Sequence, residues 1–261
     1  MVDLGSGSGL SSRWAASWAG SVVGVEPNRD MRAIAESRPV PGVSFRTGLS
    51  HDTGLPDRSA DVVLAVQAMH WMEPGPTLAE VARVLRPGGV LAVVDCDWPP
   101  ITGSARAEQA WVDIDRRIAA AEARLAGVPD LPAGAGGSGR FSSVDPGVVG
   151  AEEGPVGPEI RLGGARRWPK AGHLSRMAAS GHFAFTRELA LSQRIEGGAE
   201  RVAALLRSHG AYQQVSRLGV SDAELGVDRF AAEVAAAWAE APVPLVLAFT
   251  WRVRLGLTPQ G

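Results

Sequence analysis

The segment with the clearest chemical pattern is Val2-Asp3-Leu4-Gly5-Ser6-Gly7-Ser8-Gly9. Glycines at every second position let a backbone turn tightly between a strand and a helix, and let it approach a ligand closely. The spacing is G-x-G-x-G, which differs from the G-x-G-x-x-G of dinucleotide-binding turns. Asp3, two residues before the first glycine, would repel a pyrophosphate and attract a ligand that bears an ammonium and a sulfonium. The segment predicts a ligand-binding turn; the alternative is a glycine-rich turn that binds nothing.

A second acid, Glu26, ends the apolar run Val22–Val25. A carboxylate at the end of a second strand can accept hydrogen bonds from both ribose hydroxyls of an adenosine. The alternative is that Glu26 is a solvated acid at a strand end. Its position after the glycine turn disfavours that alternative. Asp3 and Glu26 together predict a site for a cationic nucleoside that carries no phosphate.

Several segments resemble the motifs of small-molecule class I S-adenosylmethionine-dependent methyltransferases of the methyltransferase type 11 group. They are Asp3–Gly9, Gly24-Val25-Glu26-Pro27, Ser59-Ala60-Asp61-Val62-Val63, Gln67-Ala68-Met69-His70-Trp71 and Ala82-Arg83-Val84-Leu85-Arg86-Pro87-Gly88-Gly89. The segment from Gln67 to Trp71 is similar to the subgroup of trans-aconitate methyltransferases and their fungal relatives. The resemblance covers Val2–Asp95 well and Leu245–Leu255 loosely. It implies an enzyme that moves a methyl group from S-adenosylmethionine to a small molecule, most simply to a carboxylate or a hydroxyl.

The resemblance also implies roles for individual residues around the cofactor. Asp3, Gly5 and Gly7 would line its methionine end, in the same turn as Ser6 and Gly9. The ribose would lie against Glu26 and Pro27, the adenine beside Asn28 and Met31, and the sulfonium beside Gln67. The segment Gly48-Leu49-Ser50-His51, with Leu49 and Ser50 as expected contacts, falls where many relatives place an acid next to the adenine amine. Leu49 and His51 depart from that pattern, so recognition there would rest on backbone groups.

The substrate side is expected at the end of the fourth strand. His70 would take a proton from an acidic acceptor or hydrogen-bond to it, or else pack structurally against the following helix. Trp71 would form a wall of the pocket. Trp111 would select the substrate from a lid helix, or else pack in the interior as the default for a tryptophan. Lys170 is the only lysine of the chain, and beside the many arginines it indicates a coding bias rather than a function.

These residues need an α/β framework, and the hydrophobic pattern of the first hundred residues provides one. Strands are predicted at Met1–Leu4, Val22–Val25, Val43–Arg46, Ala60–Val66 and Val90–Asp95. Helices are predicted at Leu10–Ala19, Arg29–Ser37 and Pro76–Val84. The expected fold class is a Rossmann-like three-layer α/β sandwich, with a mostly parallel sheet, an antiparallel C-terminal strand and helical lid insertions.

The rest of the chain is expected to complete the same domain. Residues 1–100 would be the cofactor-binding core, residues 101–180 a lid helix at Ala105–Ala126 followed by a flexible Gly/Pro-rich insert at Pro129–Pro169, and residues 181–261 a strand pair with helices. Strands are predicted at Phe183–Leu191 and Leu245–Leu255, and helices at Ala199–His209 and Asp222–Glu240. In the last strand, alternation places the apolar side chains from Leu245 to Leu255 on one face and Arg252 and Arg254 on the other.

Composition excludes several classes of function. The 261 residues carry a formal net charge of −2, which gives no reason to expect a nucleic-acid partner. The single cysteine, Cys96, rules out an internal disulfide and favours a reducing, cytoplasmic setting. There is no apolar run of about 18 residues, so no membrane span is expected. His173 and His182 lie in different segments and no ligand spacing indicates a metal site. The sequence does not choose between a monomer and a homodimer.

Two alternatives to an active methyltransferase stay open. Relatives carry a helical segment before the first strand, whereas this chain starts inside that strand, as if shortened at its N-terminus. We therefore expect weakened cofactor binding, which calorimetry would contradict by a micromolar or tighter dissociation constant. The chain could then be a non-catalytic adenosyl-binding relic or interaction module. An NAD-linked oxidoreductase is disfavoured by Asp3 and by the glycine spacing.

Overall fold

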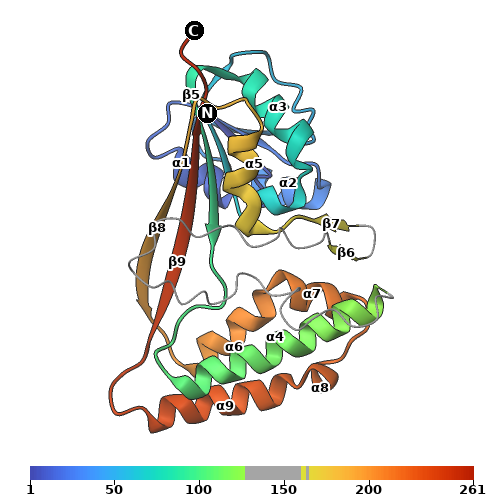
Figure 1. Cartoon of the computed structure of the whole chain (residues 1–261), viewed down its shortest axis with the longest axis vertical. Coiled ribbons are helices and arrows are strands. Elements are labelled where there is room, and N and C mark those ends of the chain that lie inside the picture. Colours follow the sequence, from blue (N-terminus) through green and yellow to red (C-terminus); the bar gives the residue numbers. More distant parts are fainter. Residues whose placement is uncertain (127–159, 163–164) are drawn as a thin grey trace.

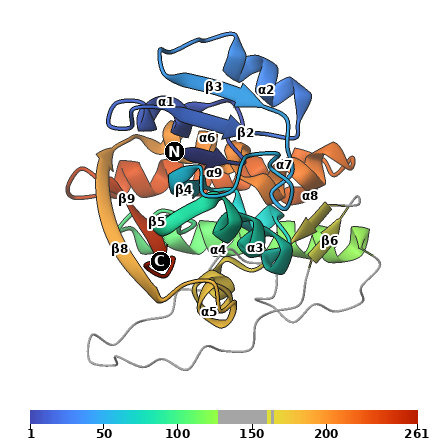
Figure 2. The same ribbon diagram turned by 90° about the horizontal axis from the view of Figure 1, so that it is seen from above.

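The computed structural model describes residues 1–126, 160–162 and 165–261 (Figure 1). They contain a seven-stranded sheet in the order β3-β2-β1-β4-β5-β9-β8, with β3 and β8 at opposite edges (Figure 2). The five N-terminal strands pair in parallel, and β9 is antiparallel to both of its neighbours. The expected Rossmann-like α/β fold class is confirmed. The strand bounds are β1 Val2–Leu4, β2 Val22–Val25, β3 Val43–Arg46, β4 Ala60–Val66, β5 Leu85–Cys96, β8 Phe185–Glu196 and β9 Val246–Leu257.

The sheet is covered on both faces near its N-terminal strands. Helices α3 (Pro74–Val84) and α5 (His173–Ala179) cover the face that carries Val2 and Leu4, in one continuous hydrophobic core. Helix α1 (Leu10–Ala15) lies on the opposite face, because two of its serines bond to Asp3. Helix α2 (Arg29–Glu36) packs beside β3. The parallel order places the carboxyl ends of β1, β2 and β4 next to one another, where open α/β sheets bind ligands.

A second hydrophobic core lies among helices at the end of the molecule away from the chain termini (Figure 1). The helices there are α4 (Ala105–Leu125), α6 (Ala199–Ser208), α7 (Gly210–Arg217), α8 (Asp222–Leu225) and α9 (Val227–Glu240). The long strands β8 and β9 reach this bundle, where Leu247 is completely buried and Ile195 packs beside it. The same two strands therefore belong to the sheet and to the helical core.

Several elements differ from the predictions for reasons visible in the backbone. The helix predicted at Asp222–Glu240 divides at Gly226, which adopts a left-handed conformation with φ 73°. Helix α7 was not predicted, because His209 takes an extended conformation and ends α6 before the chain turns helical again. Helix α5 was also not predicted. Most of the Pro129–Pro169 insert lies outside the described residues, but β6 (Ile160–Leu162) and β7 (Ala165–Arg167) pair with each other in antiparallel orientation. Among the described helices, none combines the length and the apolar character that crossing a membrane requires.

Candidate functional site

A cavity of about 610 Å³ opens at the carboxyl ends of β1, β2 and β4. This volume is in the range of sites that hold a small molecule or cofactor. Most of the predicted cofactor contacts line it: Gly5, Gly7, Glu26, Pro27, Asn28, Met31, Leu49, Ser50 and Gln67. Trp71 lines it as well, and so do residues for which the sequence analysis predicted no contact with the cofactor: Leu4, Val25, Gly48, His51, Ala68, Met72, Glu73 and Trp168. The predicted contacts Asp3, Ser6 and Gly9 are not among the lining residues.

The glycine turn has the tight shape that its spacing predicts. Gly5, Gly7 and Gly9 all have positive φ, at 71°, 53° and 77°. A Cβ atom on Gly5 would lie 2.7 Å from the Cβ of Ala68, and one on Gly9 would lie 2.7 Å from Cζ of Phe45. These two glycines are therefore required for packing. Gly7 borders the cavity itself, and its backbone is free to approach a ligand.

Hydrogen bonds to Glu26 connect the glycine turn to the end of the second strand. One carboxylate oxygen, Oε2, accepts a hydrogen bond from the Gly7 backbone N–H at 2.9 Å, and Oε1 accepts one from the Asn28 N–H at 2.8 Å. The residue is only 8% exposed, yet it lines the cavity. Each carboxylate oxygen can accept more than one hydrogen bond, so both retain capacity for a pair of hydroxyls. The residues present thus fit an adenosine ribose.

Asp3 occupies a different place from the one predicted. It pairs with Gly24, and Glu26 follows two residues later, so the two acids lie on the same side of the sheet. However, Asp3 is fully buried beneath the turn, where its Oδ2 accepts hydrogen bonds from Ser11 and Ser12 at 2.7 and 2.5 Å. Burial raises the pKa of its carboxyl group. Asp3 therefore anchors the start of α1, and a direct contact with a cofactor ammonium stays a prediction.

The adenine side of the cavity is built from backbone and apolar groups. The Asn28 side chain caps α2 by accepting from the Asp30 and Met31 N–H groups, at 2.9 and 3.1 Å. Leu49 exchanges two backbone hydrogen bonds with Asp52, which closes a tight turn. The Ser50 hydroxyl forms a hydrogen bond with the Thr77 hydroxyl on α3, at 2.8 Å between the two oxygens. With these side chains engaged, backbone groups are left to recognise a base, as the sequence suggested.

His70 and Trp71 follow β4 in the short helix η1 (Met69–Trp71), but only Trp71 lines the cavity. Trp71 is 45% exposed and can form a wall. His70 is buried, with its Nδ1 3.8 Å from Oδ1 of Asp95. Burial, followed by the positive charge of Lys170, lowers the pKa of His70 to about 2. Its ring is thus neutral near pH 7 and is a weak proton acceptor there, which argues against the predicted role as a base.

Trp111 must be reassigned from the substrate site to the helical core. Its side chain is completely buried, and its ring centroid lies 5.0 Å from that of Trp98 and 4.6 Å from that of Phe230. The predicted helical spacing of Trp111, Ile114 and Ile118 was correct, but the face that they share packs against α7 and α9. Sequence periodicity locates a buried face without telling which partner covers it.

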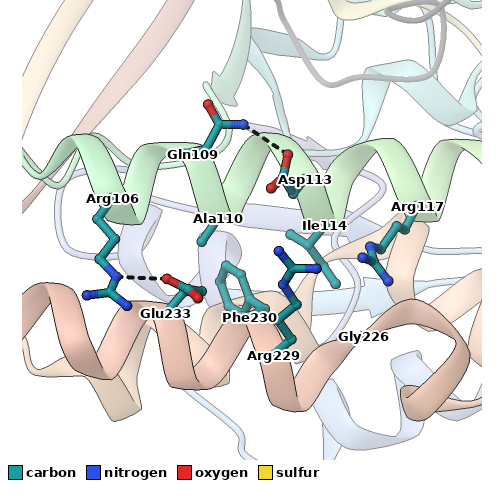
Figure 3. Close-up of a pocket in the computed structure, with 10 residues that line it drawn as sticks. All are labelled: Arg106, Gln109, Ala110, Asp113, Ile114, Arg117, Gly226, Arg229, Phe230 and Glu233. Atoms are coloured by element: carbon teal, nitrogen blue, oxygen red, sulfur yellow. Dashed lines mark hydrogen bonds and ion pairs between the residues drawn. The ribbon is translucent and has the colours of Figure 1, made fainter.

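A smaller groove of about 290 Å³ lies between α4 and α9 (Figure 3). Ala110, Ile114 and Phe230 line it together with charged side chains from both helices. An ion pair crosses it between Nε of Arg106 and Oε2 of Glu233 at 2.7 Å (Figure 3). The groove is therefore a partly charged contact between α4 and α9 within the helical bundle. Its lining residues do not include the strand ends that border the larger cavity.

Sequence reasoning missed a buried group of charges that adjoins the cavity. We call it the Asp95 cluster: Asp95 at the end of β5 together with His70, Lys170, His173 and Arg254. Asp95 is 1% exposed, and its Oδ2 accepts from Nη1 of Arg254 at 2.9 Å. Nζ of Lys170 lies 3.5 Å from Asp95 Oδ1 and donates to Oε1 of Gln67 at 2.6 Å. The sequence feature that points to this cluster is Lys170, the single lysine of the chain, which composition alone attributes to a coding bias.

Comparison with known proteins agrees with this geometry. The family described as "Methyltransferase domain" matches residues 2–93. An uncharacterized methyltransferase of Mycobacterium tuberculosis is 37% identical over 94 residues, which are 36% of this chain and 38% of that protein. Phthiotriol/phenolphthiotriol dimycocerosates methyltransferase 1 of Mycobacterium ulcerans is 38% identical over 96 residues, covering 36% of this chain and 35% of the relative. The match thus spans well under half of the length of these relatives.

Solved structures show the same fold over a larger part of the chain. A proposed type II methyltransferase from Anaeromyxobacter dehalogenans covers 100% of this chain and 90% of its own, with a TM-score of 0.60 and 23% identity. The YcgJ protein from Bacillus covers 100% and 92%, with a TM-score of 0.52 and 15% identity. At such identities the likeness concerns the fold alone.

Proposed function

We propose that the chain, whose residues 2–93 match the methyltransferase domain family, transfers a methyl group from S-adenosylmethionine to an oxygen of a small-molecule acceptor, a carboxylate or a hydroxyl. The observation that carries the proposal is the position of Glu26. Its carboxylate lines the cavity, holds the Gly7 and Asn28 N–H groups, and retains acceptor capacity for a ribose. The described residues that line the cavity include no lysine or arginine that would pair with a pyrophosphate.

S-adenosylmethionine, when bound, supplies a methyl group already activated on a positively charged sulfur. The work left to the protein is alignment and exclusion of water, which is worth about 7–11 kcal/mol in well-oriented model reactions. Gly5, Gly7 and Glu26 would orient the cofactor from the strand ends. Trp71 and Trp168 border the cavity and would exclude water from the acceptor side. Such a mechanism needs no nucleophilic triad.

A thermal-shift panel with S-adenosylmethionine, S-adenosylhomocysteine and NAD tests the cofactor. A ligand that binds only the folded state at 100 times its dissociation constant stabilises it by about 2.7 kcal/mol. We expect both adenosyl compounds to raise the melting temperature and NAD to leave it unchanged. The opposite pattern would refute the proposal.

Transfer itself is tested with methyl-labelled S-adenosylmethionine and a small-molecule extract. We expect label in a low-molecular-weight product, and slower labelling when Glu26→Gln replaces the parent chain at a cofactor concentration that saturates only the parent. Tight binding with no transfer to any fraction would identify a non-catalytic adenosyl-binding protein.

A further inference from the structure

Lys170 lies behind Gln67, between the cavity and the rest of the Asp95 cluster; it is not itself a lining residue, but its side chain is 31% exposed. It begins the short helix η2 (Lys170–Gly172), and its Nζ donates to Oε1 of Gln67 at 2.6 Å. Gln67 lines the cavity directly after β4, with φ at 52°, a left-handed conformation that only a few per cent of non-glycine residues adopt. The lysine amine is thus one hydrogen bond away from a cavity-lining side chain.

We propose that Lys170 is the general base of the methyl transfer, and that the acceptor is a hydroxyl or enol oxygen rather than a carboxylate. This inference rests on the function proposed above and narrows its acceptor class. A carboxylic acid is ionised near pH 7 without help, whereas a hydroxyl must lose its proton as it reacts. A basic group at the reacting end is needed only for the second kind of acceptor.

The step balances around the lysine amine. The acceptor oxygen forms a bond to the methyl carbon, the carbon–sulfur bond breaks, and its electron pair stays on the sulfur. The oxygen's proton passes to the lone pair of Nζ, so that one positive charge leaves the sulfur as another appears on Lys170. Oδ1 of Asp95 lies 3.5 Å from Nζ and would stabilise the new ammonium. Asp95 would thus act through Lys170 without touching the acceptor.

Charged groups on β5 and β7 act on the pKa of Lys170, together with its burial. Burial lowers the pKa of Lys170, while Asp95 and Cys96 of β5 raise it and Arg167 of β7 lowers it further. The remaining titratable neighbours are neutral histidines, whose pKa values are also lowered by burial and by this lysine: His70, His173 and His209. A lysine with a lowered pKa is a stronger candidate base near neutral pH than a free one, which would be fully protonated.

The other members of the Asp95 cluster are less suited to the role. The pKa of His70 near 2 makes its ring a weak base, and His173 is 2% exposed with a pKa near 3. Asp95 is held by Arg254, which also pairs with Glu188 at 2.7 Å. Lys170 is the one member of the cluster that hydrogen-bonds a cavity-lining side chain in the described part of the chain.

Because the chain has a single lysine, the proton on Nζ can be followed directly. Protein labelled with ¹³C-lysine gives one Cε signal, whose chemical shift reports the pKa of Lys170. We expect that pKa to be at least 0.5 unit lower in the S-adenosylmethionine complex than in the S-adenosylhomocysteine complex, because only the first ligand carries a sulfonium near the amine. Arg187→Lys, at an exposed position on β8 that lines no cavity described above, supplies a reference lysine whose pKa should not change. Equal Lys170 pKa values in the two complexes would overturn the inference, whereas absence of binding by either compound would refute the proposed function instead.

The chemistry of the labelled product decides the acceptor class. Methyl esters release volatile labelled methanol in alkali, and methyl ethers do not. We expect alkali-stable label from the parent chain, and at least a 100-fold slower transfer by Lys170→Arg, which keeps a positive charge but cannot accept a proton at neutral pH. Its affinity for S-adenosylhomocysteine, within threefold of the parent value, would show that the variant is folded. Alkali-labile label, or an active Lys170→Arg variant, would contradict the inference.

Discussion

Replacing Glu26 with glutamine is the sharpest perturbation of the cofactor site. The carboxylate accepts from the Gly7 and Asn28 N–H groups at 2.9 and 2.8 Å and is 8% exposed, so solvent screens it little. An amide keeps one acceptor oxygen and presents an NH₂ group to the other backbone N–H. One hydrogen bond to a charged group is then lost, which is worth about 1.5–3 kcal/mol. We expect this loss in the free energy of unfolding.

The same substitution should weaken cofactor binding by about 10- to 100-fold, or roughly 1.4–2.8 kcal/mol. It removes one of the two acceptors available to the ribose and loosens the glycine turn. Isothermal titration with S-adenosylhomocysteine, at a temperature where both proteins are folded, measures the effect. Glu36→Gln is the matched control, since its side chain is 54% exposed on α2 and does not line the cavity. Unchanged affinity in a folded Glu26→Gln protein would refute the assignment of the ribose site.

Three further predictions concern stability. Trp111→Ala should lower the free energy of unfolding in urea by about 3–5 kcal/mol, because it empties the centre of the helical core; Trp14→Ala, at a position that is 61% exposed, should cost about 1 kcal/mol or less. His173 is buried with its pKa lowered to about 3, so the unfolded chain binds its proton first as the pH falls. Its contribution to stability is therefore complete above about pH 6.5 and declines toward pH 3 by up to about 1.4 kcal/mol per pH unit, and His173→Asn should flatten this slope in denaturation curves. Burial raises the pKa of Asp115 to about 7, so its ionisation opposes folding as the pH rises; Asp115→Asn should raise the melting temperature more at pH 8 than at pH 5.

Local sequence determined the cofactor half of the site. The glycine turn needs three residues with positive φ within five positions, and a strand-to-helix junction is encoded by the same short segment. Glu26 could be located because parallel strands end at one edge of a sheet, so the last residue of the second strand must lie near the first turn. The bounds of β2, β3 and β4 agree with the predictions because each strand begins directly after a turn that contains glycine, proline or serine. Only β2 and β4 are mostly buried, whereas β3 is an edge strand and stays partly exposed.

The tertiary structure alone decided which charges meet behind Gln67, next to the cavity. Asp95, Lys170 and Arg254 are separated by 75 and 84 positions in the chain, and no local pattern connects them. They come together because β9 returns to pair with β5 while η2 reaches the end of β4. Burial then changes what these side chains can do, since leaving water disfavours the charged lysine and the charged histidine alike. Asp3 is a local case, since Ser11 and Ser12, which donate to it, lie only 8 and 9 positions further along the chain. Long-range packing did place Trp111 in a core, because a side chain's spacing fixes its face and only the folded chain supplies its neighbours.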